Sequence, residues 1–150
     1  MSAATSPGVH VHRFVVPFGH CDPAGIVYFP RFFDYFHLAM ETWFGAHLSM
    51  SYAEVVSGRK IGLPAVHTEA DFSKPSAFGD DLEIALRVGR IGRSSIELRY
   101  EVRGHGETQA RVTGRTVVTT FDMDPSSAKY RRSLPIPDDL RAAIEAFGVG

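Results

Sequence analysis

Hydrophobic residues follow two different periods along this chain, a helical one in the first half and a strand-like one in the second. Between residues 30 and 44, apolar side chains recur every three or four positions, which predicts a helix with one apolar face. This face comprises Phe32, Phe36, Ala39, Met40 and Trp43, and Phe29, Phe33 and Phe44 widen it. A face this wide is typical of a helix enclosed by other structure. We expect Gly45 to end the helix.

Four later segments alternate apolar and polar residues, which predicts strands with one buried face each, as in an antiparallel sheet. These segments are residues 66–73, 82–88, 95–103 and 111–120. Residues 9–16 are rich in β-branched side chains and predict a further strand. Glycine-containing segments at 92–94 and 104–106 are expected to form hairpin turns.

The order of these elements predicts the fold class. A sheet with one apolar face must cover that face, and the Phe-rich helix is the long apolar element that can do so. We therefore predict an α+β fold, with an antiparallel five-stranded sheet wrapped around one long central helix. Ser51 and Glu54 have capping-box spacing and predict a short second helix ending at Gly58. A closing helix is expected over about 137–147, and the chain, 1–150, is expected to be one domain with a core at about 9–123.

Composition narrows the functional class. The 150 residues are 44% hydrophobic and 22% charged, which is typical of a globular protein. A net charge of −1 argues against nucleic acid as a partner. The single cysteine, Cys21, excludes an internal disulfide and fits a reducing compartment. Residues 1–8 lack the pattern of a signal peptide, and no segment is apolar over a membrane-spanning length, so we expect a cytoplasmic protein without a membrane partner.

The most informative motif is the segment Asp22-Pro23-Ala24-Gly25-Ile26-Val27-Tyr28-Phe29-Pro30. Its Asp-Pro and Ala-Gly pairs favour a turn, and Pro30 suits the first turn of the following helix. The motif therefore brings a carboxylate close to the unpaired N–H groups of a helix start, which attract negative charge. An acid or base beside such an oxyanion site is the arrangement that acyl transfer needs.

The same nine residues closely resemble the signature of the 4-hydroxybenzoyl-CoA thioesterase family of the hotdog fold. The order of elements resembles that fold over roughly residues 9–123, and Phe78-Gly79-Asp80-Asp81-Leu82 resembles the start of the family's third strand. The resemblance implies an acyl-CoA thioesterase without a separate cofactor, since coenzyme A is part of its substrate. It also implies a homodimer as the minimal active unit, with two equivalent sites at the subunit interface, and pairing of dimers into a homotetramer.

The resemblance assigns roles to particular residues. Asp22 matches the catalytic carboxylate, which either attacks the carbonyl carbon or activates a water molecule, and the backbone N–H of Phe29 matches the group that polarises the carbonyl. The regions that hold CoA phosphates in the family contain Arg90, Arg93, Lys129, Arg131 and Arg132 here. The candidate substrate contacts are His20, Tyr28, His37 and His67.

Other interpretations stay open at this point. His37 stands where the hydroxybenzoyl enzyme has an acidic residue, so an aromatic acyl group is the first choice and a short or medium aliphatic one the second. The chain could also be a non-catalytic acyl-CoA binding protein of the same fold, with Asp22 only a turn residue. Hydratases of this fold use a histidine motif that is absent here. His10 and His12 share a strand face without a third ligand in view, so no metal site is predicted.

Overall fold

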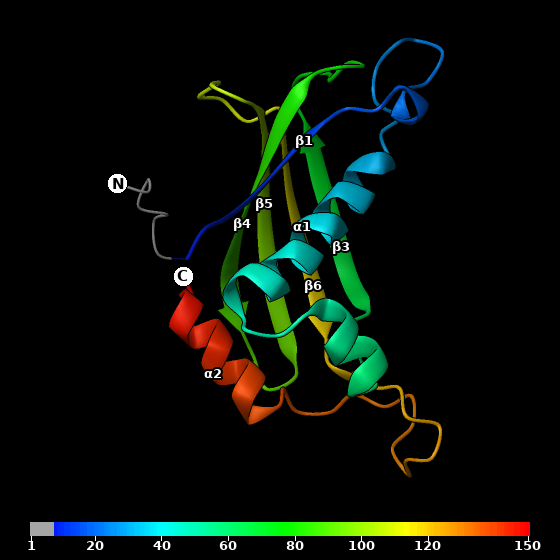
Figure 1. Cartoon of the computed structure of the whole chain (residues 1–150), viewed down its shortest axis with the longest axis vertical. Helices are drawn as coiled ribbons and strands as arrows, with labels where there is room; N and C mark the ends of the chain where they lie inside the picture. Colours follow the sequence, from blue (N-terminus) through cyan, green and yellow to red (C-terminus); the bar gives the residue numbers. More distant parts are fainter. Residues whose placement is uncertain (1–7) are drawn as a thin grey trace.

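The structure is a computed structural model that describes residues 8–150, and the first seven residues lie outside the described part. In chain order the elements are β1 (His10–Val15), η1 (Phe18–His20), α1 (Arg31–His47), η2 (Glu54–Gly58), β2 (Ile61–Gly62), β3 (Ala65–Phe72), β4 (Asp81–Ile91), β5 (Ser95–Gly104), β6 (Val112–Thr119), β7 (Phe121–Asp122) and α2 (Asp138–Phe147). Five strands form one antiparallel sheet in the order β1-β4-β5-β6-β3, which curves around α1 (Figure 1). The predicted α+β fold is confirmed.

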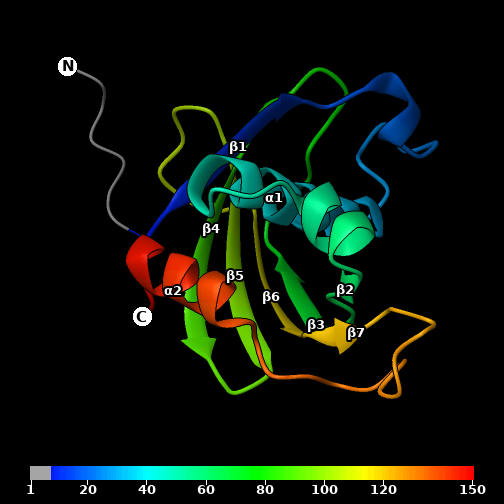
Figure 2. The ribbon, with the colours of Figure 1, turned by 60° about the horizontal axis from the view of Figure 1, so that its bottom comes forward.

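The core lies between α1 and the inner face of the sheet. Alternate residues of β4 and β5 are buried against the helix, because successive side chains of a strand point to opposite faces. The second helix, α2, packs beside α1 over the same side of the sheet (Figure 2). Its Phe147 ring lies 5.5 Å from that of Trp43 on α1, centroid to centroid. Both helices thus cover the apolar face that the sequence pattern predicts.

The central helix differs from the prediction at both ends. The expected apolar face is buried from Phe32 to Trp43, but Phe29 precedes the helix and is 59% exposed. The helix also continues past Gly45 and ends at His47, so the predicted end was wrong. Gly45 faces open space and needs no special backbone angle, and packing of Phe44 and Leu48 holds the last turn in place.

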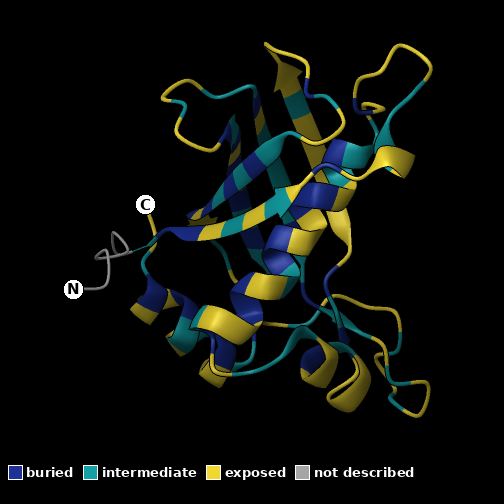
Figure 3. Cartoon of the chain, turned by 45° about the horizontal axis from the view of Figure 1, so that its top comes forward, coloured by how far each residue is buried: buried dark blue, intermediate teal, exposed yellow. Residues whose placement is uncertain are grey.

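The edge strand β3 contradicts the expectation that every strand has a buried face. Every residue of β3 except Ala70 is exposed (Figure 3), and the exposed fraction of the apolar Val66 reaches 64%. Its residues alternate as predicted, but within residues 8–150 its inner face stays largely uncovered. An exposed edge strand with apolar side chains is a surface on which another strand can pair.

The connecting segments follow the predicted chemistry. The β4–β5 turn is at residues 92–94, and Gly106 takes a φ of +84° in the loop that follows β5. The Ser51 hydroxyl accepts a hydrogen bond from the Glu54 N–H at 3.0 Å, as expected of a cap. The short helix that follows is a single π-helical turn. Among residues 8–150 no helix is long and apolar enough to cross a membrane.

Candidate active site

The turn between η1 and α1 fixes the carboxylate of Asp22. The Asp22 N–H donates to the Ile26 carbonyl and the Gly25 N–H donates to the Asp22 carbonyl, both at 2.9 Å. The turn needs the positive φ of +82° at Gly25, a conformation that glycine adopts without strain. Asp22 Oδ1 accepts a hydrogen bond from the Ala24 N–H at 2.9 Å, whereas Oδ2 accepts none from residues 8–150. One carboxylate oxygen therefore orients the side chain, and the other is left without a hydrogen-bond partner in the described part of the chain.

The start of α1 provides a free backbone donor beside this turn. The N–H groups of Tyr28, Arg31 and Phe32 donate to carbonyls at 3.0, 2.9 and 3.1 Å. The Phe29 N–H donates to no acceptor in the described part of the chain, and Pro30 has no N–H. The helix has no side-chain cap at this end. Its positive dipole end is thus open to an incoming oxygen.

An apolar groove of about 400 Å³ lies against this helix start. Phe29 and Phe32 form one wall, and Phe72, at the end of β3, forms another. The loop of residues 73–76 completes the lining. The Phe32 and Phe72 rings lie 5.6 Å apart, edge to face. The groove can hold an apolar group of a ligand whose reactive atom reaches the helix start.

Two of the candidate substrate contacts lie near this turn. His20 Nδ1 is 2.8 Å from the Tyr35 hydroxyl, so this imidazole is held against α1. Burial raises the pKa of Tyr35 to about 12, which keeps its hydroxyl protonated and able to donate. Tyr28 is 53% exposed, with its ring edge against Phe29. Cys21 is half-buried, and its sulfur lies 4.0 Å from the Pro17 carbonyl.

The other two candidate contacts lie further along α1 and on β3. His37 is exposed on α1, with Nδ1 3.2 Å from Glu41 Oε2, and it borders a second cavity between α1 and the sheet. His67 alternates with Thr68, which lines that cavity, so the two side chains point to opposite faces of β3. His67 Nε2 lies 3.7 Å from Glu69 Oε2 on the outer face. Neither apolar pocket includes His67.

A basic pocket of about 300 Å³ lies at the other end of the sheet. Arg93, from the β4–β5 turn, borders it together with Lys129 and Arg132, from the segment after β7. Two regions that are far apart in the sequence are thus brought together. Arg90 and Arg131 do not line the pocket; Arg90 is exposed on β4, and the Arg131 guanidinium lies over the Tyr130 ring at 5.0 Å.

The sequence as a whole matches a described protein family. A profile of the thioesterase-like superfamily matches residues 16–144, which include the Asp22 turn, α1 and every strand of the five-stranded sheet except β1. The chain belongs to that superfamily. It is therefore an enzyme of the thioesterase type.

Relatives of this thioesterase include 1,4-dihydroxy-2-naphthoyl-CoA hydrolases of cyanobacteria. The protein of Prochlorococcus marinus (strain MIT 9303) is 30% identical over 145 residues, which cover 92% of this chain and 91% of the relative. That of Synechococcus sp. (strain CC9311) is 33% identical over 142 residues, covering 90% and 88%. The crystal structure of a 1,4-dihydroxy-2-naphthoyl-CoA thioesterase from Synechocystis is 26% identical, with a TM-score of 0.79 over 91% of this chain and 96% of that one.

The resemblance to the 4-hydroxybenzoyl-CoA enzymes holds at the level of the fold. The structure of the 4-hydroxybenzoyl-CoA thioesterase from Pseudomonas sp. strain CBS-3 has a TM-score of 0.79 at 24% identity, over 91% of this chain and 99% of that one. The thioesterase thus has the hotdog fold, and its membership of the wider superfamily is shown. Its similarity in sequence is to hydrolases named for a bicyclic aromatic acyl group.

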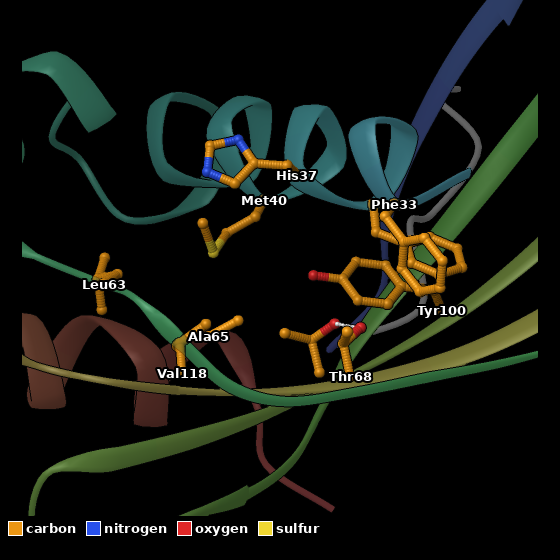
Figure 4. A pocket seen from close by; sticks show the side chains of 10 residues that line it. Phe33, His37, Met40, Leu63, Ala65, Thr68, Tyr100 and Val118 are labelled. Atoms are coloured by element: carbon orange, nitrogen blue, oxygen red, sulfur yellow. Dashed lines mark hydrogen bonds between the residues drawn. The ribbon is translucent and has the colours of Figure 1, made fainter. Parts of the chain in front are cut away.

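Sequence reasoning missed two polar residues close to the thioesterase's site. Tyr100 counted only as one apolar position of an alternating strand, yet its hydroxyl points into the cavity that His37 borders (Figure 4). A tyrosine among aliphatic residues carries a polar atom that needs a partner, and that was the available signal. Arg111 counted as a solvated strand residue, yet its side chain is only 11% exposed and is paired with two carboxylates. No local pattern predicts such a pair.

Proposed function

We propose that this protein hydrolyses the thioester of an aromatic acyl-CoA to the carboxylic acid and free CoA, with Asp22 as the catalytic carboxylate. The observation that carries this proposal is the free Oδ2 of Asp22 next to a helix start whose Phe29 N–H has no acceptor among residues 8–150. An aromatic acyl group is supported by the aromatic lining of the groove and by the names of the relatives. No cofactor is required, because coenzyme A is part of the substrate.

The chemistry follows from these two groups. The thioester carbonyl oxygen accepts a hydrogen bond from the Phe29 N–H, which stabilises the negative charge that develops on it. In one route an Asp22 oxygen attacks the carbonyl carbon, the C–S bond breaks, and the thiolate of CoA leaves and takes up a proton. Water then hydrolyses the mixed anhydride and restores Asp22. In the other route Asp22 accepts a proton from a water molecule that attacks the carbonyl directly; the C–S bond then breaks and the proton passes to the leaving thiolate of CoA.

The phosphates of CoA are proposed to bind in the basic pocket. Arg93, Lys129 and Arg132 border one pocket of about 300 Å³, and paired cations of this kind suit phosphate oxygens. Arg90 and Arg131 belong to the same proposed surface as flanking cations. Arg93 and Arg132 are exposed, so their positive charge is available to a ligand.

The active unit is proposed to be a homodimer formed through β3. The groove at the helix start adjoins Phe72, at one end of β3. The basic pocket adjoins the other end of β3. There the Thr119 N–H donates to the carbonyl of Pro64, just before β3, and the Thr119 hydroxyl lies 3.3 Å from that of Ser133, which lines the pocket. Antiparallel pairing of two β3 edges therefore sets the Asp22 turn of one protomer beside the basic pocket of its partner. Two such dimers are proposed to form a homotetramer, in the cytoplasm.

Thiol release from a panel of acyl-CoAs tests the catalytic assignment. The panel contains benzoyl-, 4-hydroxybenzoyl-, 1,4-dihydroxy-2-naphthoyl- and short or medium aliphatic acyl-CoAs, each with wild type and Asp22→Asn. The asparagine keeps an oxygen for the Ala24 N–H, so the turn is preserved while kcat falls by about 100-fold or more. Equal activity of the variant would remove Asp22 from the mechanism. Release from none of the panel would favour a non-catalytic binding protein, and a preference for aliphatic substrates would contradict the aromatic assignment.

The phosphate site has a different kinetic signature. Arg93→Ala and Arg132→Ala should raise KM and leave kcat nearly unchanged, because the nucleotide is held equally in the ground and transition states. Arg87→Ala removes an exposed arginine from β4 that does not border the basic pocket, and it serves as the control. A selective loss of kcat in the two pocket variants would contradict a phosphate-binding role.

A further inference from the structure

The basic pocket has two walls that come from distant parts of the chain. The turn wall is the β4–β5 turn with Arg93 and Ser94, and the segment wall is residues 129–135 with Lys129 and Arg132. Figure 2 shows the segment wall running from β7 past the β4–β5 turn toward α2. Cations on two separate walls bind one anionic group tightly only if the walls are held at a fixed distance before the ligand arrives.

Thr120, between β6 and β7, forms hydrogen bonds with both walls. Its N–H donates to the Ser94 carbonyl at 2.8 Å, and its carbonyl accepts from the Leu134 N–H at 3.0 Å. Its hydroxyl lies 2.5 Å from the Leu134 carbonyl and 3.3 Å from the Ser94 carbonyl. A hydroxyl has one proton, and the shorter distance assigns this proton to Leu134. The residue is fully buried and does not itself line the pocket.

The hydroxyl of Thr120 is what secures the segment wall. No other donor among residues 8–150 reaches the Leu134 carbonyl. Leu134 lines the pocket and lies two residues after Arg132. A carbonyl that faces a buried side chain and loses its donor is unfavourable, so without this hydroxyl the segment wall would shift toward water.

The turn wall has anchors that do not involve the Thr120 side chain. The Arg93 carbonyl accepts a hydrogen bond from the Ile136 N–H at 2.9 Å. On α2, Arg141 Nη2 donates to the Gly92 carbonyl at 2.6 Å and to the Arg93 carbonyl at 3.2 Å. Loss of the Thr120 hydroxyl should therefore leave Arg93 in place and displace the cations of the segment wall relative to it.

We propose that Thr120 is a positioning residue for the phosphates of CoA, and that its hydroxyl holds Lys129 and Arg132 at the distance from Arg93 at which both walls contact one nucleotide. The inference rests on the proposed acyl-CoA hydrolysis and deepens its phosphate site. Thr120 carries no charge and does not reach the pocket, so it acts on the ligand only through the walls. The acyl and pantetheine parts of the substrate lie outside the basic pocket and should not sense it.

Kinetics with two substrates test this role. The first is an acyl-CoA that the wild type hydrolyses, and the second is the pantetheine thioester of the same acyl group, which lacks the nucleotide and its phosphates. Thr120→Val should raise KM for the acyl-CoA by about five- to tenfold, leave kcat within about twofold, and leave kcat/KM for the pantetheine thioester within about twofold. Thr120→Ser keeps a hydroxyl and should restore KM to within about twofold of wild type.

The control is Thr113→Val, which removes an exposed hydroxyl of β6 that does not border the basic pocket and should change neither substrate's kinetics. Equal losses of kcat/KM on both substrates in Thr120→Val would show a general structural effect and overturn the inference. An unchanged KM for the acyl-CoA in Thr120→Val would overturn it as well.

A double-variant comparison tests whether Thr120 acts through the cations. Once Arg132→Ala has removed a cation that Thr120 positions, the further change Thr120→Val should raise KM by no more than about threefold. Effects of the two substitutions that multiply in full would mean that they act independently, which contradicts positioning.

Calorimetric titration with CoA itself separates this inference from the proposed hydrolysis. Thr120→Val should weaken CoA binding by about five- to tenfold, and Thr120→Ser should bind as wild type does. That result without thiol release from any acyl-CoA would reject the hydrolysis and retain the positioning role. Thiol release together with weak CoA binding in Arg93→Ala but unchanged binding in Thr120→Val would reject the positioning role and retain the hydrolysis.

Discussion

Arg111 Nη1 lies 2.7 Å from Asp80 Oδ2, and this ion pair anchors the loop on which the Asp22 turn rests. The same Asp80 oxygen accepts a hydrogen bond from the Ala77 N–H at 2.9 Å, and Ala77 pairs with Ile26 in an isolated antiparallel bridge. The neighbouring Ser76 carbonyl accepts from the Val27 N–H at 2.8 Å. This partly buried ion pair therefore holds the loop that contacts the Asp22 turn, without touching Asp22 itself.

Loss of this anchor should reduce both stability and turnover. Arg111→Met leaves Asp80 and Glu107 without their shared cation in a partly buried place, which should lower the free energy of unfolding by roughly 1–3 kcal/mol. Because the Asp22 turn loses its support, kcat should fall more than KM rises at temperatures where the variant is folded. Urea denaturation and thiol release measure the two effects. Arg99→Met removes an exposed arginine from Glu97, which keeps Arg115 as its partner, and should change stability by less than about 0.5 kcal/mol.

Two glycine substitutions should change stability in opposite directions. A Cβ on Gly114 would lie 2.4 Å from two atoms of the Phe36 ring, and that ring cannot move freely because it is stacked on Tyr100. Gly114→Ala should therefore destabilise the protein by about 1–3 kcal/mol. Gly45→Ala adds a methyl group to a helix interior with nothing within 4 Å and should stabilise by roughly 0.5–1 kcal/mol. Thermal unfolding of both variants checks the two signs.

Stability should fall with acid before the carboxylates titrate, because of His10. Burial, followed by the nearby charges of His47 and His12, lowers the pKa of His10 to about 4. Its Nε2 lies 2.8 Å from the Thr42 hydroxyl, and its ring lies 5.0 Å from that of His47, which in turn packs on Phe147. The unfolded chain binds a proton near the ordinary pKa of about 6.5 and the folded chain does not, so stability decreases as the pH falls from about 6.5 to 4.

Replacement of that histidine isolates its share of the pH dependence. His10→Gln can keep a hydrogen bond to Thr42 but cannot take up a proton. Its free energy of unfolding, measured by urea titration between pH 7.5 and 4.5, should decrease less steeply than that of wild type. Between pH 7.5 and pH 4.5, wild type should lose about 2–3 kcal/mol more of its free energy of unfolding than His10→Gln loses. Parallel curves for the two proteins would contradict this assignment.

The edge of β3 is the expected dimer interface. Wild type should sediment with four times the chain mass of 16.5 kDa, the mass of the proposed tetramer of two β3-paired dimers. Val66→Lys places a charge on an exposed apolar position of that edge and should shift the mass toward the monomer, with loss of thiol release. Val11→Lys, at a 46% exposed position on the other edge strand, is the matched control and should keep the mass of the wild type. A dimer that withstands Val66→Lys and dissociates with Val11→Lys would place the interface on β1.

The local sequence around Asp22 predicted most of the candidate site. The turn, the helix start and the free N–H at Phe29 lie within nine consecutive residues, so proline and glycine geometry fixes them together. The period of the apolar positions likewise predicted α1 and the sheet. It failed at Gly45, because packing of Phe44 and Leu48 outweighs the weak tendency of glycine to end a helix.

Side chains that meet across the fold could not be predicted in this way. Arg93 and Arg132 are brought to one pocket by the turn after β4 and the segment after β7, and Tyr100 faces His37 only because β5 packs under α1. The sequence by itself determined the main helices and strands, the buried faces of α1, β4 and β5 and the carboxylate turn, because these depend on neighbours within a few residues. Tertiary structure alone decided the cavity, the basic pocket and the exposure of β3, because these depend on which strands pair and how closely the helix approaches them.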